Sequence, residues 1–235
     1  MQSMILLDYG KRKCKRLKKI LRVYLVAAAV LLFVTACGKT APAPSPSPPS
    51  HTTQALKWDS APKMTIDPNK NYEAVFDTSK GKFTMQLFAK DAPITVNNFV
   101  FLSKQGYYNN VIFHRIIKTF MIQTGDPTGT GRGGPGYTIQ DELQANQKYT
   151  YGPGIVAMAK TSQPNSGGSQ FFICTGADSS FLNQSPVYPI FGKIISGMDV
   201  VQAIADTQVK ANPDSGEKSM PAEKVSINKI DIIEK

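Results

Sequence analysis

The chain has 235 residues, with 27 Lys and Arg against 17 Asp and Glu, a formal net charge of +10. Such a balance first suggests nucleic acid or an acidic membrane surface as a partner. Eight of the basic residues, however, lie within residues 1–36 beside a single acid, and the rest of the chain holds 19 basic and 16 acidic side chains. The basic charge belongs mainly to a leader, so we expect no nucleic-acid partner.

Residues 1–36 have the organisation of a signal peptide. Basic residues precede an apolar run from Val23 to Ala36, which is short for a membrane-spanning helix. The run ends in Val34-Thr35-Ala36-Cys37 and resembles the lipobox of bacterial lipoproteins, whose cysteine receives diacylglycerol. We therefore expect Cys37 to carry the lipid that anchors the protein to the extracytoplasmic face of the cell membrane. The alternative is an uncleaved signal anchor, with Cys37 an ordinary buried thiol.

Residues 37–70 are predicted to form a tether after the lipidated cysteine. The stretch from residue 40 to residue 53 is rich in Pro, Ser and Ala, and such a composition favours an extended, semi-rigid chain over a packed core. A ligand for a proline-binding module is the alternative for this stretch. Residues 54–70 remain polar, and Trp58, the only tryptophan, is expected to pack on the surface of the folded domain.

The folded domain is expected over residues 71–235, a length that suits one core. Apolar residues in alternation or in short runs predict strands, and apolar residues at helical spacing predict two helices. The expected strands lie near 72–76, 83–88, 111–115, 121–123, 154–159, 170–174, 190–195 and 225–233, and the helices near 91–106 and 198–206. This pattern fits a mainly β domain with a closed antiparallel barrel.

The sequence contains no motif of a hydrolase, a metalloenzyme or a nucleotide-binding protein. Of the three cysteines, Cys14 and Cys37 belong to the leader and the lipid site, so Cys174 has no disulfide partner and is expected to be a small buried side chain. His114 is expected to be a packed, hydrogen-bonded strand residue, because no nucleophilic serine motif accompanies it. We expect no metal site, since no cluster has ligand spacing. The glycine-rich residues 129–134 match no nucleotide-binding motif and predict a loop that lines a groove.

Arg115 lies in an unusual position, within the apolar run from Phe113 to Met121. An unpaired charge is costly in such surroundings. A surface arginine on an edge strand is the simpler interpretation. However, the run contains no acidic neighbour, and Phe120, Met121 and Gln123 lie close by. We therefore interpret the run as one half of a binding site, in which Gln123 holds the guanidinium.

Four motifs in order resemble one family. These are Phe-His-Arg-Ile-Ile-x-x-Phe-Met-Ile-Gln-x-Gly-Asp from Phe113, Gly-Ile-Val-Ala-Met-Ala from Gly154, Gly-Ser-Gln-Phe-Phe-Ile from Gly168, and Phe-Gly-Lys-Ile-Ile-Ser-Gly-Met-Asp-Val-Val from Phe191. From about residue 71 to the C-terminus the chain resembles the cyclophilin-type peptidyl-prolyl cis-trans isomerases. The resemblance implies a closed eight-stranded barrel capped by two α-helices, and an isomerase that needs no cofactor.

The resemblance also implies the roles of particular residues. Arg115 would act on the rotating amide, with Gln123 orienting it. Gln170 and the backbone of Ala159, Lys160 and Thr161 would hold the substrate in extended form. The pocket for the proline ring would be lined by Phe120, Met121, Phe172 and Leu182, with Phe181 at its rim, and Tyr188 would be a further substrate-binding residue. On periodicity alone, Phe120, Met121 and Phe172 would be plain core residues.

Three positions depart from the better-known pattern of the family. Phe181 stands where many members carry tryptophan, Tyr188 aligns with a pocket histidine, and Ala159-Lys160-Thr161 replaces an Ala-Asn-Ala strip. Cyclosporin binding in the family depends on that tryptophan, so we expect it to be weakened here.

Two functions follow as hypotheses. The first is a monomeric isomerase that accelerates rotation of X-Pro bonds in unfolded or exported proteins and assists their folding outside the cytoplasmic membrane. The second is a catalytically weak module that binds proline-containing peptides as a chaperone. The presence of Arg115 and Gln123 favours the first.

Overall fold

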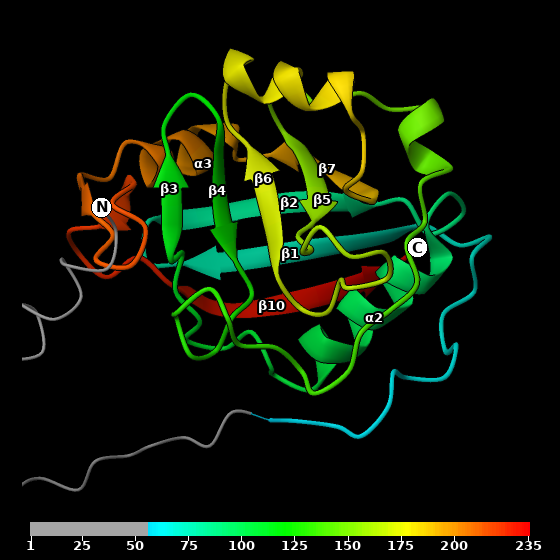
Figure 1. Cartoon of the computed structure of the whole chain (residues 1–235). Coiled ribbons are helices and arrows are strands. Elements are labelled where there is room, and N and C mark those ends of the chain that lie inside the picture. Colours follow the sequence, from blue (N-terminus) through cyan, green and yellow to red (C-terminus); the bar gives the residue numbers. More distant parts are fainter. Residues whose placement is uncertain (1–55) are drawn as a thin grey trace, which may run out of the picture. The chain divides into compact units, whose positions relative to one another are not determined.

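The computed structural model describes residues 56–235 (Figure 1). The expected signal peptide, the lipid site at Cys37 and the Pro/Ser-rich part of the tether lie outside the described residues. Among those described, no helix is both long and apolar enough to cross a membrane.

A curled antiparallel sheet of eight strands forms the body of the domain (Figure 1). Each strand pairs with neighbours in the order β10-β1-β2-β7-β5-β6-β4-β3. The strands are β1 (Tyr72–Thr78), β2 (Gly81–Leu87), β3 (Arg115–Ile117), β4 (Met121–Thr124), β5 (Ile155–Met158), β6 (Phe171–Cys174), β7 (Ile190–Ser196) and β10 (Ile227–Glu234). The mainly β class and the order of elements agree with the sequence pattern, except that the run from 111 to 114 precedes the strand that begins at Arg115.

Alternation of side chains explains why β1 is a strand with one face in the core. Tyr72, Ala74 and Phe76 are buried, and the residues between them are partly exposed. The turn to β2 is tight, with Gly81 at φ 129°, a conformation that other residues rarely adopt. Phe76 and Phe83 then stack across the two strands at 4.4 Å between ring centroids.

The two edges of the sheet meet only briefly. An isolated bridge joins Ile112 to Ser226, and the backbone N–H of Phe113 donates to the carbonyl of Val225 at 2.9 Å. In the described part of the chain, β3 and β10 form no continuous ladder with each other. The closed barrel expected from the sequence is therefore not confirmed.

Helices α2 (Pro93–Lys104) and α3 (Met198–Ala205) lie where helical spacing predicts them. Proline begins α2, where its missing N–H is no loss, and Gly106 follows its end with φ 68°. Phe99 of α2 meets Phe171 and Phe191 of the sheet, each with ring centroids 5.5 Å away. The helix thereby seals one side of the core.

Two features near the site are not evident from the sequence pattern. Short 3-10 helices, η1 (Ala145–Gln147) and η2 (Ala177–Gln184), follow β4 and β6. A separate hairpin is formed by β8 (Val209–Ala211) and β9 (Lys218–Pro221). Strands this short contain too few residues to show alternation, so tertiary packing sets their conformation.

The segment before β1 packs on the domain. The Trp58 ring lies 5.1 Å from that of Phe101 and 5.8 Å from that of Tyr107, between centroids, and its backbone N–H donates to the carbonyl of Pro135 at 2.8 Å. Ile66 is buried in the main core. We call residues 57–70 the strap, because they connect helix α2 with the loop that contains Pro135.

Candidate active site

A pocket of about 280 Å³ opens between the ends of β4, β5 and β6 and helix η2. Its lining contains the four residues expected to hold a proline ring, together with Phe181, expected at the rim, and Tyr188, expected to bind substrate. The full lining is Arg115, Phe120, Met121, Gln123, Ala159, Lys160, Phe172, Phe181, Leu182 and Tyr188. The structure thus brings together ten residues from four separate parts of the sequence.

Local structure explains the positions of the apolar side chains. Met121 and Phe172 come from the paired strands β4 and β6, and both are almost fully buried. Phe120 sits in the turn between β3 and β4, and its ring lies 5.0 Å from that of Phe181 on η2. The Tyr188 ring meets Phe172 edge-on at 5.5 Å between centroids, which closes the opposite side.

Backbone hydrogen bonds hold η2 against that turn. The N–H groups of Thr175 and Asp178 donate to the carbonyls of Phe120 and Thr119, each at 3.0 Å. Gly176 approaches closely as well, since a Cβ at this position would lie 2.6 Å from the Thr119 oxygen. Leu182 and Phe181 are therefore placed by a rigid connection.

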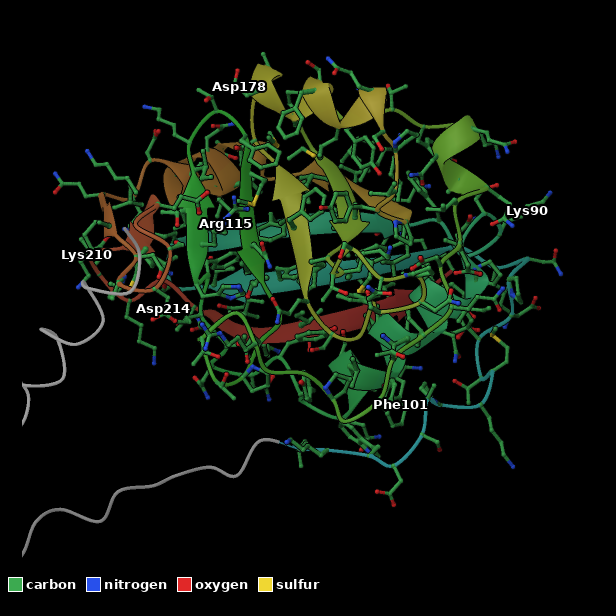
Figure 2. The ribbon with its side chains drawn as sticks, viewed as in Figure 1. Lys90, Phe101, Arg115, Asp178, Lys210 and Asp214 are labelled. Atoms are coloured by element: carbon green, nitrogen blue, oxygen red, sulfur yellow. The ribbon has the colours of Figure 1, made fainter. Side chains whose placement is uncertain are left out.

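Arg115 begins β3 (Figure 2), and its side chain lines the pocket. Its Nε and Nη2 donate to the two carboxylate oxygens of Glu217 at 2.7 and 2.8 Å. Its Nη1 lies 3.6 Å from the Met121 sulfur, and its Cζ lies 5.8 Å from the centre of the Phe120 ring. The hydrogen bond and the charge of Arg115 lower the pKa of Glu217, so this carboxylate stays ionised at neutral pH.

Gln123 pairs with Arg115 across β3 and β4, but its side chain has another partner. Its Nε2 donates to Gln170 Oε1 at 3.0 Å, and Gln170 in turn donates to the carbonyls of Gly131 and Gly133 at 3.0 and 2.9 Å. The expectation that Gln123 holds the guanidinium is wrong for this structure, because Glu217 occupies that role. Glu217 follows Arg115 by 102 residues in a polar segment, so no local pattern could have indicated it.

A buried carboxylate organises the glycine-rich loop, residues 127–136. Asp126 is fully buried and accepts hydrogen bonds from the backbone N–H groups of Thr128, Thr130, Gly131 and Gly133. Burial raises the pKa of Asp126, but these hydrogen bonds outweigh it and leave the pKa below its usual value. Gly133 is required here, because a Cβ would lie 1.9 Å from the Asp126 carboxylate.

A second cavity, of about 470 Å³, continues from the pocket along this loop. It shares Gln123, Ala159 and Lys160 with the pocket and contains the other two predicted residues, Thr161 and Gln170. The Lys160 side chain is only 6% exposed, and its Nζ lies 3.1 Å from Asp141 Oδ2, an acceptor that sequence reasoning missed. The loop and the Ala159–Thr161 backbone thus form the two walls of a groove, as expected.

His114 differs from its expected environment. It is 8% exposed, and neither ring nitrogen has a hydrogen-bond partner within residues 56–235. Burial lowers its pKa, which favours the neutral ring. His114 is therefore packed as expected, but it is not hydrogen-bonded.

Cys174 is buried, and burial raises the pKa of its thiol to about 11. A neutral thiol is a poor nucleophile, and this agrees with a packing role. No group of three or more potential metal ligands occurs in the part of the chain that the structure describes.

The pocket has apolar side chains beside an arginine, and an extended groove continues from it. Comparison with known proteins identifies the class. Residues 74–232 match the family model described as cyclophilin type peptidyl-prolyl cis-trans isomerase/CLD. The chain belongs to this family, and its enzyme class is peptidyl-prolyl cis-trans isomerase.

Named relatives and solved structures agree. The chain is 47% identical over 165 residues to peptidyl-prolyl cis-trans isomerase-like 1 of Aspergillus oryzae, covering 69% of this chain and 96% of the relative. It is 44% identical over 139 residues to peptidyl-prolyl cis-trans isomerase CYP18-2 of Arabidopsis thaliana, covering 58% and 82%. A crystal structure of a cyclophilin-type isomerase from Cryptosporidium parvum matches with a TM-score of 0.62 and 34% identity, covering 69% of this chain and 98% of that one.

A second crystal structure of the Cryptosporidium parvum protein, in the presence of the dipeptide Ala-Pro, matches with a TM-score of 0.61 and 36% identity, covering 68% and 98%. The relatives named here are eukaryotic. They give no support to the bacterial lipoprotein form that the leader suggests.

Proposed function

We propose that this domain binds an X-Pro segment in extended form, places the proline ring in the 280 Å³ pocket and rotates the preceding amide beside Arg115. One observation carries the proposal. Arg115 lines the same pocket as Phe120, Met121, Phe172 and Leu182, and its Nη1 points towards the Met121 sulfur at 3.6 Å. A permanent donor is thus held at the edge of a site that fits a small apolar ring.

The chemistry requires no acid, base or nucleophile. The barrier to rotation is the partial double bond of the amide, roughly 18–20 kcal/mol. A ten-thousandfold acceleration needs about 5.4 kcal/mol of differential stabilisation. Twisting localises the lone pair on the proline nitrogen, so a donor directed at that nitrogen or at the rotating carbonyl stabilises the twisted amide more than either planar form.

The central prediction is that Arg115→Ala lowers kcat by about 10²–10³, as expected for loss of one preorganised transition-state donor. KM should change much less, because the interaction is weaker with the planar amide. Arg115→Lys should recover only part of the rate, since an ammonium lacks the planar fork. Exchange NMR on an X-Pro peptide measures both parameters.

Phe172→Ala serves as the contrasting variant. It empties the ring pocket, so binding and turnover should fall together. Wild-type turnover in Arg115→Ala would remove Arg115 from the mechanism. A wild type that binds the peptide without accelerating exchange would instead support the chaperone or peptide-binding module.

We further propose that the substrates are exported proteins and that the enzyme works outside the cytoplasmic membrane, anchored by a lipid on Cys37. The support comes from the sequence alone: the basic leader, the apolar run and Val34-Thr35-Ala36-Cys37, followed by a Pro/Ser-rich spacer. Such a spacer would hold the groove away from the bilayer.

A further inference from the structure

The Arg115 guanidinium lies between two cavities. On one side is the ring pocket, which Glu217 does not line. On the other is a depression of about 1060 Å³, whose lining includes Arg115, Gln123, Glu217 and most of the loop between β8 and β9. Figure 2 labels Arg115 together with Lys210 and Asp214 of the neighbouring hairpin. A long side chain with open space on both sides needs a restraint if it is to face only one of them.

Glu217 supplies such a restraint from the side away from the ring pocket. Its two oxygens take the Nε and Nη2 edge of the guanidinium, which leaves Nη1 on the side of Met121. Because the guanidinium is planar, two parallel hydrogen bonds define the direction of the third nitrogen.

The loop that carries Glu217 is itself held by hydrogen bonds. The Asn212 side-chain oxygen accepts from the backbone N–H of Asp214 at 2.8 Å, and the Asn212 N–H donates to the Glu217 carbonyl at 2.8 Å. The N–H of Ser219 donates to the same carbonyl at 2.9 Å. The Asp214 carboxylate takes no part in these bonds and instead accepts from Arg132 Nη2 of the glycine-rich loop at 2.9 Å, where both side chains are exposed. Glu217 is therefore fixed at its backbone as well as at its carboxylate.

We propose that Glu217 is a positioning residue for the isomerase reaction, which directs Nη1 of Arg115 at the X-Pro amide. The inference rests on the proposed role of Arg115. Glu217 does not itself line the ring pocket and contacts its lining through Arg115, so its effect on turnover passes through the guanidinium. Small displacements of a catalytic group reduce rate much more than they reduce substrate binding.

The test compares Glu217→Gln with a matched control, Asp214→Asn. Both remove one negative charge from the same loop, but Asp214 pairs with Arg132 at the surface and does not contact Arg115. We expect Glu217→Gln to lower kcat about tenfold with KM changed less than twofold. Asp214→Asn should leave both unchanged. On an Arg115→Lys background, Glu217→Gln should reduce kcat much less than it does in the wild type.

A spectroscopic measurement separates orientation from turnover. The Arg115 Nε–H signal in a ¹H–¹⁵N spectrum, assigned with Arg115→Lys, should be sharp in the wild type and in Asp214→Asn. In Glu217→Gln it should shift and broaden, because one of the two oxygens becomes an amide nitrogen that cannot accept.

Three results would overturn the inference in an active enzyme: wild-type or higher kcat in Glu217→Gln, an equal loss in Asp214→Asn, or an Nε–H signal that Glu217→Gln leaves unchanged. If the wild type shows no turnover, it is the proposed function that fails, and the signal alone still reports whether Glu217 holds Arg115.

Discussion

Phe181 is the most exposed aromatic side chain of the ring pocket, with 53% of its surface accessible. It covers one edge of Phe120 and offers no hydrogen-bond donor. An indole has a larger face and an N–H. At the residue scale, the rim of the pocket is therefore where inhibitor affinity can change without a change in the Arg115 chemistry.

We predict that Phe181→Trp strengthens cyclosporin binding about tenfold, or roughly 1.4 kcal/mol. Peptide turnover should change little, because the floor of the pocket is formed by Met121 and Phe172. Inhibition constants for the two proteins provide the measurement. Equal inhibition would show that Phe181 does not stand where the family carries its tryptophan.

Individual residues show where sequence reasoning succeeds and where it stops. Arg115 and Phe172 could be found because each lies in a contiguous motif, and the structure places both at one pocket. The partner of Gln123 could not be found, since choosing between Arg115 and Gln170 requires side-chain positions in space. Glu217 has no motif, and only the fold brings it to Arg115.

At the scale of elements, the strap connects two parts of the domain. Trp58 packs against helix α2 and bonds to the loop at Pro135. Gly136 accommodates it, because a Cβ there would lie 2.6 Å from the Trp58 oxygen. Residues outside the region matched to the family model thus help to hold one wall of the groove.

We expect Trp58→Ala to lower the free energy of unfolding by about 2 kcal/mol, less than for a fully buried tryptophan because Trp58 is half-buried. Leu56→Ala is the control and should cost less than about 0.5 kcal/mol, since Leu56 is 48% exposed. Urea denaturation followed by circular dichroism measures both. If the two variants unfold alike, the strap contributes nothing to stability.

Some helices and strands can be predicted from the sequence pattern and others cannot. The seven residues of β1 alternate clearly, and α2 begins with proline and is followed by glycine, so both could be predicted. The β8–β9 hairpin has strands of only three and four residues with exposed lysines, and its pattern is that of a loop. It is nevertheless the element that carries Glu217.

At the scale of the whole molecule, the prediction of the folded domain and the prediction of the lipid anchor rest on different parts of the sequence. The resemblance supplied the prediction of a closed eight-stranded barrel with two helices, because strand pairing depends on contacts that no single segment contains. The eight strands and the two helices are present, and closure of the barrel is not confirmed. The proposed anchor rests on residues 34–37, where the predicted leader ends.

Cys37→Ser removes the only sulfur that the lipobox offers. We predict that this variant incorporates no labelled fatty acid and is found in the medium or as an uncleaved precursor, while isomerase activity per molecule is unchanged. Radiolabelled palmitate and membrane fractionation provide the measurement. Lipid uptake and fractionation identical to the wild type would show that Val34-Thr35-Ala36-Cys37 is not a lipid-attachment signal.

The arrangement around Asp126 makes part of the site sensitive to acid. Because its folded-state pKa is lowered, this carboxylate contributes fully to stability above its usual pKa and loses that contribution as pH falls through the lowered value. Protonation would make Asp126 a weaker acceptor for the N–H groups of residues 128–133. The backbone carbonyls in this loop that accept from Gln170 would then be held less firmly. The apolar side chains of the ring pocket do not titrate. Acidification should therefore weaken binding of the extended peptide in the groove before it weakens binding of the proline ring in the pocket.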